Sequence, residues 1–77
     1  MNILDLREFR KGKGYQRQFI ATNVGICGKH LNDVEAGRVN LTKKVALKLS
    51  EVYKVNISKV IDMYMEGRTR YEKGRGN

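Results

Sequence analysis

The sequence contains one cysteine, one histidine and no proline among its 77 residues. One cysteine excludes an intramolecular disulfide and is typical of proteins in the reducing cytosol rather than of secreted disulfide scaffolds. One cysteine and one histidine are too few for a dedicated metal site, so we expect neither a metal nor another cofactor. A chain this short then depends on dense local packing of helices, or on a dimer, for its stability.

Long apolar runs are missing as well. Asp5, Arg7 and Glu8 interrupt the first apolar residues, which excludes a signal peptide, and no stretch approaches the length of a membrane span. We therefore expect a cytoplasmic protein without a membrane partner. The patterns of catalytic sites are also lacking: we find no nucleophile with a base, no pair of acids, and in residues 10–14 two glycines without the spacing of a phosphate-binding loop. We expect that the protein is not an enzyme.

The net charge of +8 is distributed unevenly along the chain. Residues 1–35 hold six Lys or Arg and four Asp or Glu, a net charge of +2, whereas residues 36–77 hold ten and four, a net charge of +6. A basic excess of this size favours a polyanionic partner such as nucleic acid. The alternative is that the charge only keeps the protein soluble.

Apolar residues recur at helical spacing along most of the chain, and no strand or internal repeat is evident. We predict an all-α fold, a compact five-helix domain over residues 1–66, followed by a basic, flexible tail over residues 67–77. The helices are expected over residues 3–11 with Asn2 as N-cap, over 17–23, from 28 to 35 or 36, from 43 after the cap Thr42, and from 57 after the cap Asn56 to Gly67, where glycine is expected to end the last helix.

The stretch from Arg17 to Gly37 has the pattern of two short helices joined by a tight turn. Gly25 can adopt a positive φ, so it can end the first helix and start the turn. The small side chain of Ala21 allows the helices to cross closely, and Leu31 and Val34 lie three apart on one face of the second helix. This is the pattern of a helix-turn-helix, whose second helix enters the major groove of DNA.

Over about residues 6–61 the chain resembles the helix-turn-helix domains of the phage repressor and Cro (Xre-like) family. The matching patterns are R-x-x-K-G at residues 10–14, F-I-A-x-x-x-G-I at 19–26, L-x-x-V-E-x-G at 31–37, A-L-K-L at 46–49 and V-N-I at 55–57. The chain departs from the family in having Gln16 and Arg17 where Ser and Gln are usual, and Cys27 where Ser or Thr is usual.

The resemblance implies a sequence-specific transcriptional regulator that binds double-stranded DNA. The simplest form is a small bacterial or phage repressor that binds a palindromic operator as a homodimer. We expect no second domain and therefore no domain for a small-molecule ligand, so that control could come from a regulatory protein partner. The alternative is a protein-interaction module of the same fold, such as an antitoxin, in which DNA contact is secondary.

The second helix of the motif carries the candidates for contact with bases: Gly28, Lys29, His30 and Asp33. An ammonium such as that of Lys29 can pair with guanine O6 and N7, a contact that contributes about 1–3 kcal/mol of discrimination; a phosphate contact is the alternative. Asp33 can accept from cytosine N4 or repel the backbone of other sequences, and His30 can donate to a base or phosphate or remain a surface residue. Gly28 occupies the first recognition position but offers no side chain to a base.

Candidates for phosphate contact lie on this helix and on both sides of it. They are Arg17, Asn32, Arg38, Asn40, Lys43 and Lys44. Asn32 can alternatively pair with adenine. Lys43 and Lys44 oppose the dipole of the helix that they begin, which is explained if a phosphate lies opposite them; the alternative is that they are only solvated.

Glu35 is a carboxylate in a region expected to face DNA, and such a charge needs a partner. In the resembling family an arginine at the position of Arg10 pairs with a glutamate at this position, which implies a structural ion pair between Arg10 and Glu35.

The last helix has more apolar residues than a small domain can bury. Candidates for a two-fold dimer contact are Ile57, Ile61, Met63, Tyr64 and Met65. Such a contact would place two recognition helices about 34 Å apart, one turn of DNA.

Overall fold

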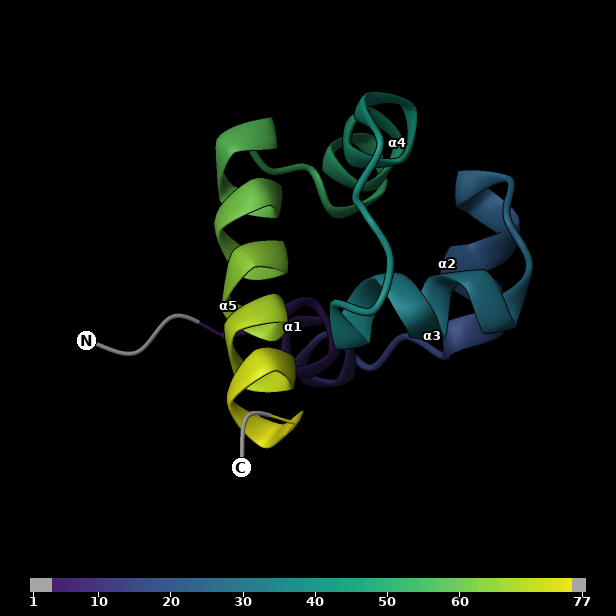
Figure 1. Ribbon diagram of the computed structural model, residues 1–77. Helices are drawn as coiled ribbons and strands as arrows, with labels where there is room; N and C mark the ends of the chain where they lie inside the picture. The colour runs from purple at the N-terminus through teal and green to yellow at the C-terminus, as the bar shows by residue number, and fades with distance from the viewer. Residues whose placement is uncertain (1–3, 76–77) are drawn as a thin grey trace.

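The computed structural model describes residues 4–75, with side chains described as far as Lys73 (Figure 1). Residues 4–75 form five helices and no strand: α1 Leu6–Gly12, α2 Arg17–Val24, α3 Gly28–Ala36, α4 Lys43–Tyr53 and α5 Ile57–Arg75. The predicted all-α fold with five helices is therefore confirmed. None of these helices is long and apolar enough to cross a membrane.

The first helix begins at Leu6 rather than at residue 3, as the sequence had suggested. Asp5 has an extended backbone, and its side chain accepts a hydrogen bond from the backbone N–H of Glu8 at 2.8 Å, so Asp5 is the N-cap. Asn and Asp are equally good caps, and the structure uses Asp5. The cap predicted at Asn2 lies outside the described residues.

Helices α2 and α3 form the predicted helix-turn-helix. Gly25 adopts a φ of 86°, and its N–H donates to the carbonyl oxygens of Ala21 and Thr22, which ends α2. Ala21 is fully buried where α2 packs on its neighbours. The Sγ atom of Cys27 accepts a hydrogen bond from the N–H of His30 at 3.4 Å and so caps α3, although sulfur is a weaker acceptor than the oxygen of Ser or Thr.

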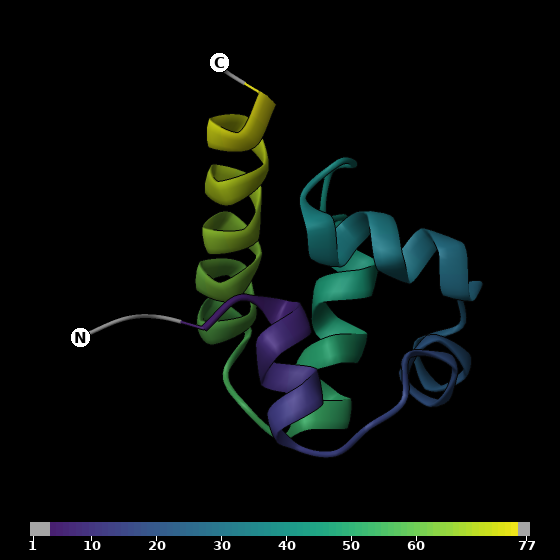
Figure 2. The ribbon, with the colours of Figure 1, turned by 90° about the horizontal axis from the view of Figure 1, so that it is seen from below.

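All five helices contribute to one core. Helix α4 packs on both α2 and α5, and Figure 2 shows it between the helix-turn-helix and α5. The most deeply buried large side chains are Leu6 from α1, Ile20 from α2, Leu31 and Val34 from α3, Leu49 from α4, and Val60 and Met63 from α5. Burial of each such side chain contributes about 1.5–3 kcal/mol to folding.

The structure corrects part of the predicted dimer contact. Met63 is 1% exposed and Tyr64 is 6% exposed, so both belong to the core of the protomer. They are buried because the face of α5 that carries them packs against α3 and α4. Ile57 is half-buried against the same core, whereas Ile61 and Met65 remain exposed.

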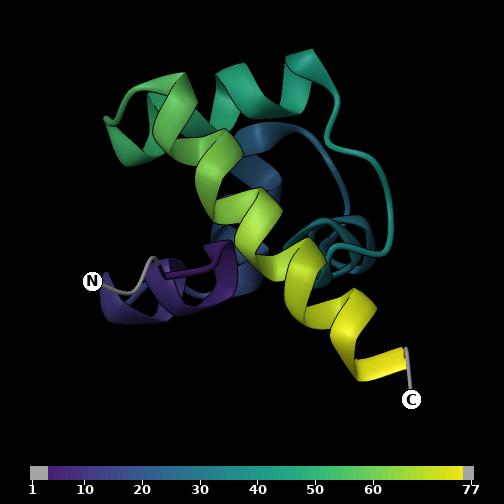
Figure 3. The same cartoon turned by 60° about the vertical axis from the view of Figure 1, so that its left-hand side comes forward.

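Helix α5 continues through Gly67, where the sequence had suggested its end, and the described part of the predicted tail is helical to Arg75. A Cβ atom at Gly67 would lie 2.7 Å from the carbonyl oxygen of Glu35, a distance that real Cβ atoms essentially never show. Gly67 therefore serves the close crossing of α5 over the end of α3, and Figure 3 shows α5 running diagonally across the other helices. The need for glycine at this position comes from a contact between two helices. The local sequence does not show that contact, so Gly67 resembled the end of a helix.

Candidate nucleic-acid interface

Glu35, near the end of α3, forms a buried ion pair with Arg10 of α1. Arg10 Nε lies 2.7 Å from Glu35 Oε2, and Arg10 Nη2 donates to Glu35 Oε1 at 3.3 Å. Arg10 Nη1 also donates to the carbonyl oxygen of Tyr15 at 2.9 Å. The two charged residues are only 6% and 2% exposed, so separating them would leave a charge buried without a partner. The pair thus holds α3 against α1.

Tyr53 of α4 lies close to this ion pair. Its hydroxyl is buried and has no hydrogen-bond partner among the described residues. Burial, and then the nearby Glu35 carboxylate, raise the pKa of Tyr53 far above its usual range, so the phenol stays neutral. The rings of Phe9 and Tyr15 lie 5.0 Å and 6.2 Å from the Tyr53 ring, centroid to centroid. Tyr15 also stacks on Phe19 of α2, with ring centroids 5.4 Å apart, so these aromatic rings connect α1 and α4 with α2.

The outer side of α3 carries Lys29 and Asp33, with Arg38 just after the helix. Asp33 Oδ2 lies 3.4 Å from Lys29 Nζ, and Asp33 Oδ1 lies 3.3 Å from Arg38 Nη1. Partial burial of the carboxyl group opposes its ionisation, but hydrogen bonds from Arg38 and Lys29 outweigh this and lower the pKa of Asp33. Asp33 is therefore engaged by two cations of its own chain, while Lys29 remains 85% exposed. His30 is partly buried.

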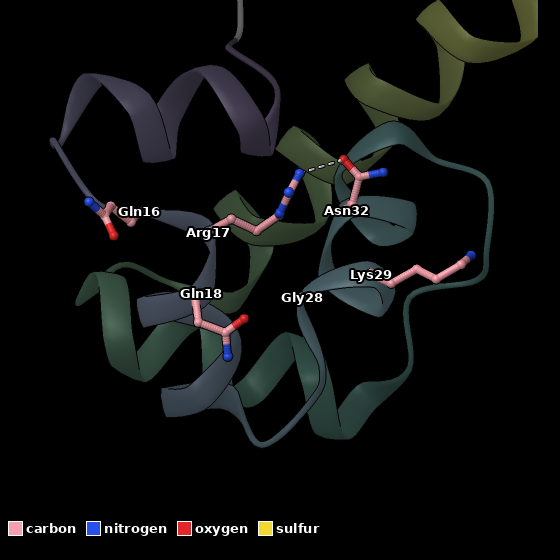
Figure 4. Close-up of a pocket in the computed structure, with 6 residues that line it drawn as sticks. All are labelled: Gln16, Arg17, Gln18, Gly28, Lys29 and Asn32. Carbon is pink, nitrogen blue, oxygen red and sulfur yellow. Dashed lines mark hydrogen bonds between the residues drawn. The ribbon is translucent and has the colours of Figure 1, made fainter.

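An open groove separates the start of α2 from the start of α3. The residues that line it are Gln16, Arg17, Gln18, Gly28, Lys29 and Asn32. Figure 4 shows Arg17 reaching across the groove to Asn32, and Lys29 extending away from α3. Arg17 Nη1 donates to Asn32 Oδ1 at 3.2 Å. A Cβ at Gly28 would lie 3.1 Å from Gln18 Oε1, so the missing side chain leaves room for this amide.

Arg7 of α1 also contacts Asn32, although the sequence had not singled it out. Arg7 Nη2 donates to Asn32 Oδ1 at 2.9 Å, and Arg7 Nε lies 3.7 Å from Glu35 Oε1. Two guanidinium groups, those of Arg7 and Arg17, thus converge on one neutral amide oxygen. Because like charges are held together there without a carboxylate at Arg17 among the described residues, the arrangement is suited to an anion. The spacing of three residues between Arg7 and Arg10 was the only signal that both face α3.

The loop from α3 to α4 holds further candidates for phosphate contact. Arg38 and Asn40 lie in this loop, and Lys43 and Lys44 form the first turn of α4. Both lysines are exposed, and no described residue forms an ion pair with either. Asn40 Oδ1 lies 3.5 Å from Arg68 Nη1 of α5, a contact that the sequence did not predict. Lys43 and Lys44 at the start of α4 are therefore cations that no described carboxylate neutralises, whereas Arg38 in the loop is paired with Asp33.

The arrangement can bind a polyanion along α3. It has no group of three or more metal-ligating side chains within the described residues. Its outward cations and amides are the groups that proteins use to contact phosphates and the edges of bases.

Comparison with known proteins agrees with this geometry. The helix-turn-helix family model matches residues 6–60, which is more than half of the chain. No curated protein and no solved structure matches the chain. The match begins at α1 and ends in α5, so it contains the whole helix-turn-helix and its buried ion pair. The chain belongs to the helix-turn-helix family of the phage repressor and Cro (Xre-like) type, and it is a regulator that binds double-stranded DNA.

Proposed function

We propose that the protein is a small repressor that binds a palindromic operator as a homodimer, with α3 of each protomer in the major groove. The observation that carries this proposal is that both acidic residues of α3 are paired with cations of the same chain. Glu35 is buried against Arg10, and Asp33 is paired with Lys29 and Arg38. The helix expected to meet DNA therefore presents no carboxylate without a cationic partner.

Base contact falls mainly on Lys29 in this proposal. Its side chain is 85% exposed and extends from the first turn of α3, whereas Gly28 beside it has no side chain to offer. Lys29 can leave Asp33 at little cost, because exposed ion pairs contribute little to stability. Asp33, once held only by Arg38, can then accept from cytosine N4 or disfavour other sequences, and His30 lies at the edge of the contact.

Phosphates are proposed to lie on both sides of α3. On one side Arg7 and Arg17 converge on Asn32, and a phosphate oxygen can accept from both guanidinium groups. On the other side the candidates are Arg38, Asn40, Lys43 and Lys44. Lys43 and Lys44 stand at a helix N-terminus, where free N–H groups add to the attraction for an anion.

The dimer is proposed to use the exposed side of α5. Ile61 and Met65 are 43% and 51% exposed and lie four residues apart, so they share one face of the helix. Ile57 extends this face at the start of α5. A two-fold contact there is self-complementary, since the same residues meet their copies.

Selection of bound duplexes from a random pool, at stated salt, tests this function. We expect an enriched palindrome with half-sites about 10 base pairs apart, centre to centre. A single enriched half-site would contradict the dimer, and the absence of any enrichment would contradict sequence-specific binding.

A further inference from the structure

The part of α5 that follows Val60 lies outside the residues that match the family model. Figures 1 and 3 show this part of α5 passing the C-terminal end of α3 and the loop that leads to α4. A Cβ at Gly37, which ends α3, would lie 2.4 Å from Arg68 Cα, and one at Gly67 would lie 2.7 Å from the Glu35 carbonyl oxygen. One glycine on each side thus allows the two backbones to touch.

Two side chains of α5 bind the loop at this crossing. The Tyr64 hydroxyl donates to the carbonyl oxygen of Val39 at 2.6 Å. Arg68 Nη1 donates to the same hydroxyl at 3.1 Å and lies 3.5 Å from Asn40 Oδ1. The hydroxyl accepts from one partner while donating to the other, so the contacts strengthen each other. Together they hold two consecutive loop residues against α5.

The contact with Asn40 also orients its amide. Since the Oδ1 atom of Asn40 faces the Arg68 guanidinium, the Nδ2 group is left to donate to a phosphate oxygen. Arg68 itself lies 3.6 Å from Glu72 Oε2, so its charge is partly neutralised. A guanidinium engaged by a hydroxyl, an amide and a carboxylate is better suited to hold the loop than to bind DNA.

We propose that Arg68, acting with Tyr64, is a positioning residue that holds Val39 and Asn40 so that the loop can contact a DNA phosphate. The inference rests on the proposed function, because it assumes that this loop meets the DNA backbone. It makes the extension of α5 a part of the DNA-binding unit rather than a tail.

The test compares three variants of the full chain. Arg68→Ala removes the guanidinium, and Tyr64→Phe removes only the hydroxyl while keeping the ring in the core. Arg70→Ala is the matched control, because Arg70 lies on the same helix but pairs with Asp5 and Glu8 of the α1 end at 2.9 Å and 2.8 Å. Amide hydrogen exchange of residues 38–41 in the free protein is the first measurement, and affinity for a DNA duplex is the second.

We expect Arg68→Ala and Tyr64→Phe to speed exchange of the loop amides by about tenfold, as expected when a local contact that restrains a loop is lost. Affinity for the duplex falls by about fivefold, the usual effect of one hydrogen bond. In a background that carries Asn40→Ala, the further change Arg68→Ala costs little more, because the two act through one contact. Arg70→Ala leaves loop exchange unchanged.

Unchanged exchange in both variants overturns the positioning role. If affinity falls while exchange is unchanged, Arg68 instead contacts DNA directly. The same conclusion follows if the effects of Arg68→Ala and Asn40→Ala on affinity multiply. If the wild-type protein binds no duplex at all, the proposed function fails, and exchange alone then shows whether α5 holds the loop. In a further outcome, the wild-type protein binds a duplex while the variants leave loop exchange unchanged and the effects of Arg68→Ala and Asn40→Ala on affinity multiply. In that case only the positioning role fails.

Discussion

Asp33 and Glu35 lie two residues apart on α3, and the protein neutralises them in opposite ways. Glu35 points inward to Arg10, and both are almost completely buried. Asp33 points outward to Lys29 and Arg38, whose side chains are 85% and 50% exposed. A buried pair is costly to break, whereas an exposed pair can exchange partners with little change in stability. One side of α3 is therefore fixed, whereas the other side can exchange partners, as the proposed contact with DNA requires.

The largest effect is expected at the buried pair. Glu35→Gln leaves the Arg10 guanidinium buried without a counter-charge, and we expect the free energy of unfolding to fall by about 3–5 kcal/mol. Urea denaturation measures this change. The double variant Arg10→Met with Glu35→Leu is the control, since it removes both charges and should lose much less. A change in Glu35→Gln below about 0.5 kcal/mol, the range of ordinary surface substitutions, would contradict the difference between the two sides of α3.

The next effect is expected where α5 crosses the end of α3. Gly67→Ala places a Cβ against the Glu35 carbonyl oxygen, and we expect a loss of about 1–3 kcal/mol, as for overpacking, despite the better helix propensity of alanine. Gly12→Ala is the matched control, because a Cβ there meets nothing within 4 Å. Thermal denaturation of the two variants compares them, with Gly12→Ala at least as stable as the wild type. Equal behaviour of the two would mean that the close crossing is not required.

The smallest effect on stability is expected at the outer pair. Asp33→Asn removes the carboxylate between Lys29 and Arg38, and we expect the free energy of unfolding at neutral pH to change little. Affinity for random-sequence duplexes should rise severalfold. The substitution removes a carboxylate that repels DNA, and it frees Lys29 and Arg38 to contact phosphates. Filter binding at low salt measures it, and a fall in affinity would show that Asp33 itself contributes a favourable contact.

The lowered pKa of Asp33 fixes the sign of its pH dependence. A carboxyl group with a depressed pKa in the folded protein adds stability above its ordinary value of 3.8, and this contribution is lost as the pH falls through the lowered pKa. The wild-type protein should thus lose more stability than Asp33→Asn between neutral pH and about pH 3. If the stability of the two proteins falls equally as the pH is lowered, Asp33 is not paired in the folded protein.

The sequence predicted most of the fold because its signals are local. Apolar spacing indicated five helices, and Gly25 and Thr42 marked the turn of the motif and the start of α4. The start of α1 was misplaced because Asn2 and Asp5 are both good caps. The end of α5 was misplaced because a glycine is needed at position 67 to avoid a clash with the carbonyl oxygen of Glu35. Glu35 lies 32 residues away in the chain, so no local sequence pattern shows this contact.

The sequence singled out candidate site residues where residue type alone suggested the chemistry, and their contact with DNA stays a prediction. Arg17, Lys29 and Asn32, singled out from the motif, line one groove. Arg7, Gln18 and Arg68 were missed, because an arginine or glutamine on a helix surface is ordinary until the fold brings it to a partner. For Arg7 and Arg68 these partners, Asn32 and Asn40, lie 25 and 28 residues away along the chain.

The most direct test of the account compares Lys29→Ala with Lys44→Ala on a selected operator and on a random duplex across a salt series. Lys29→Ala should reduce the preference for the operator by about 1–3 kcal/mol, while binding to the random duplex changes far less. Lys44→Ala should weaken both complexes and reduce the slope of log affinity against log salt by about 0.9. If neither substitution changes binding to any duplex, α3 and the start of α4 do not contact DNA, and the central claim is wrong.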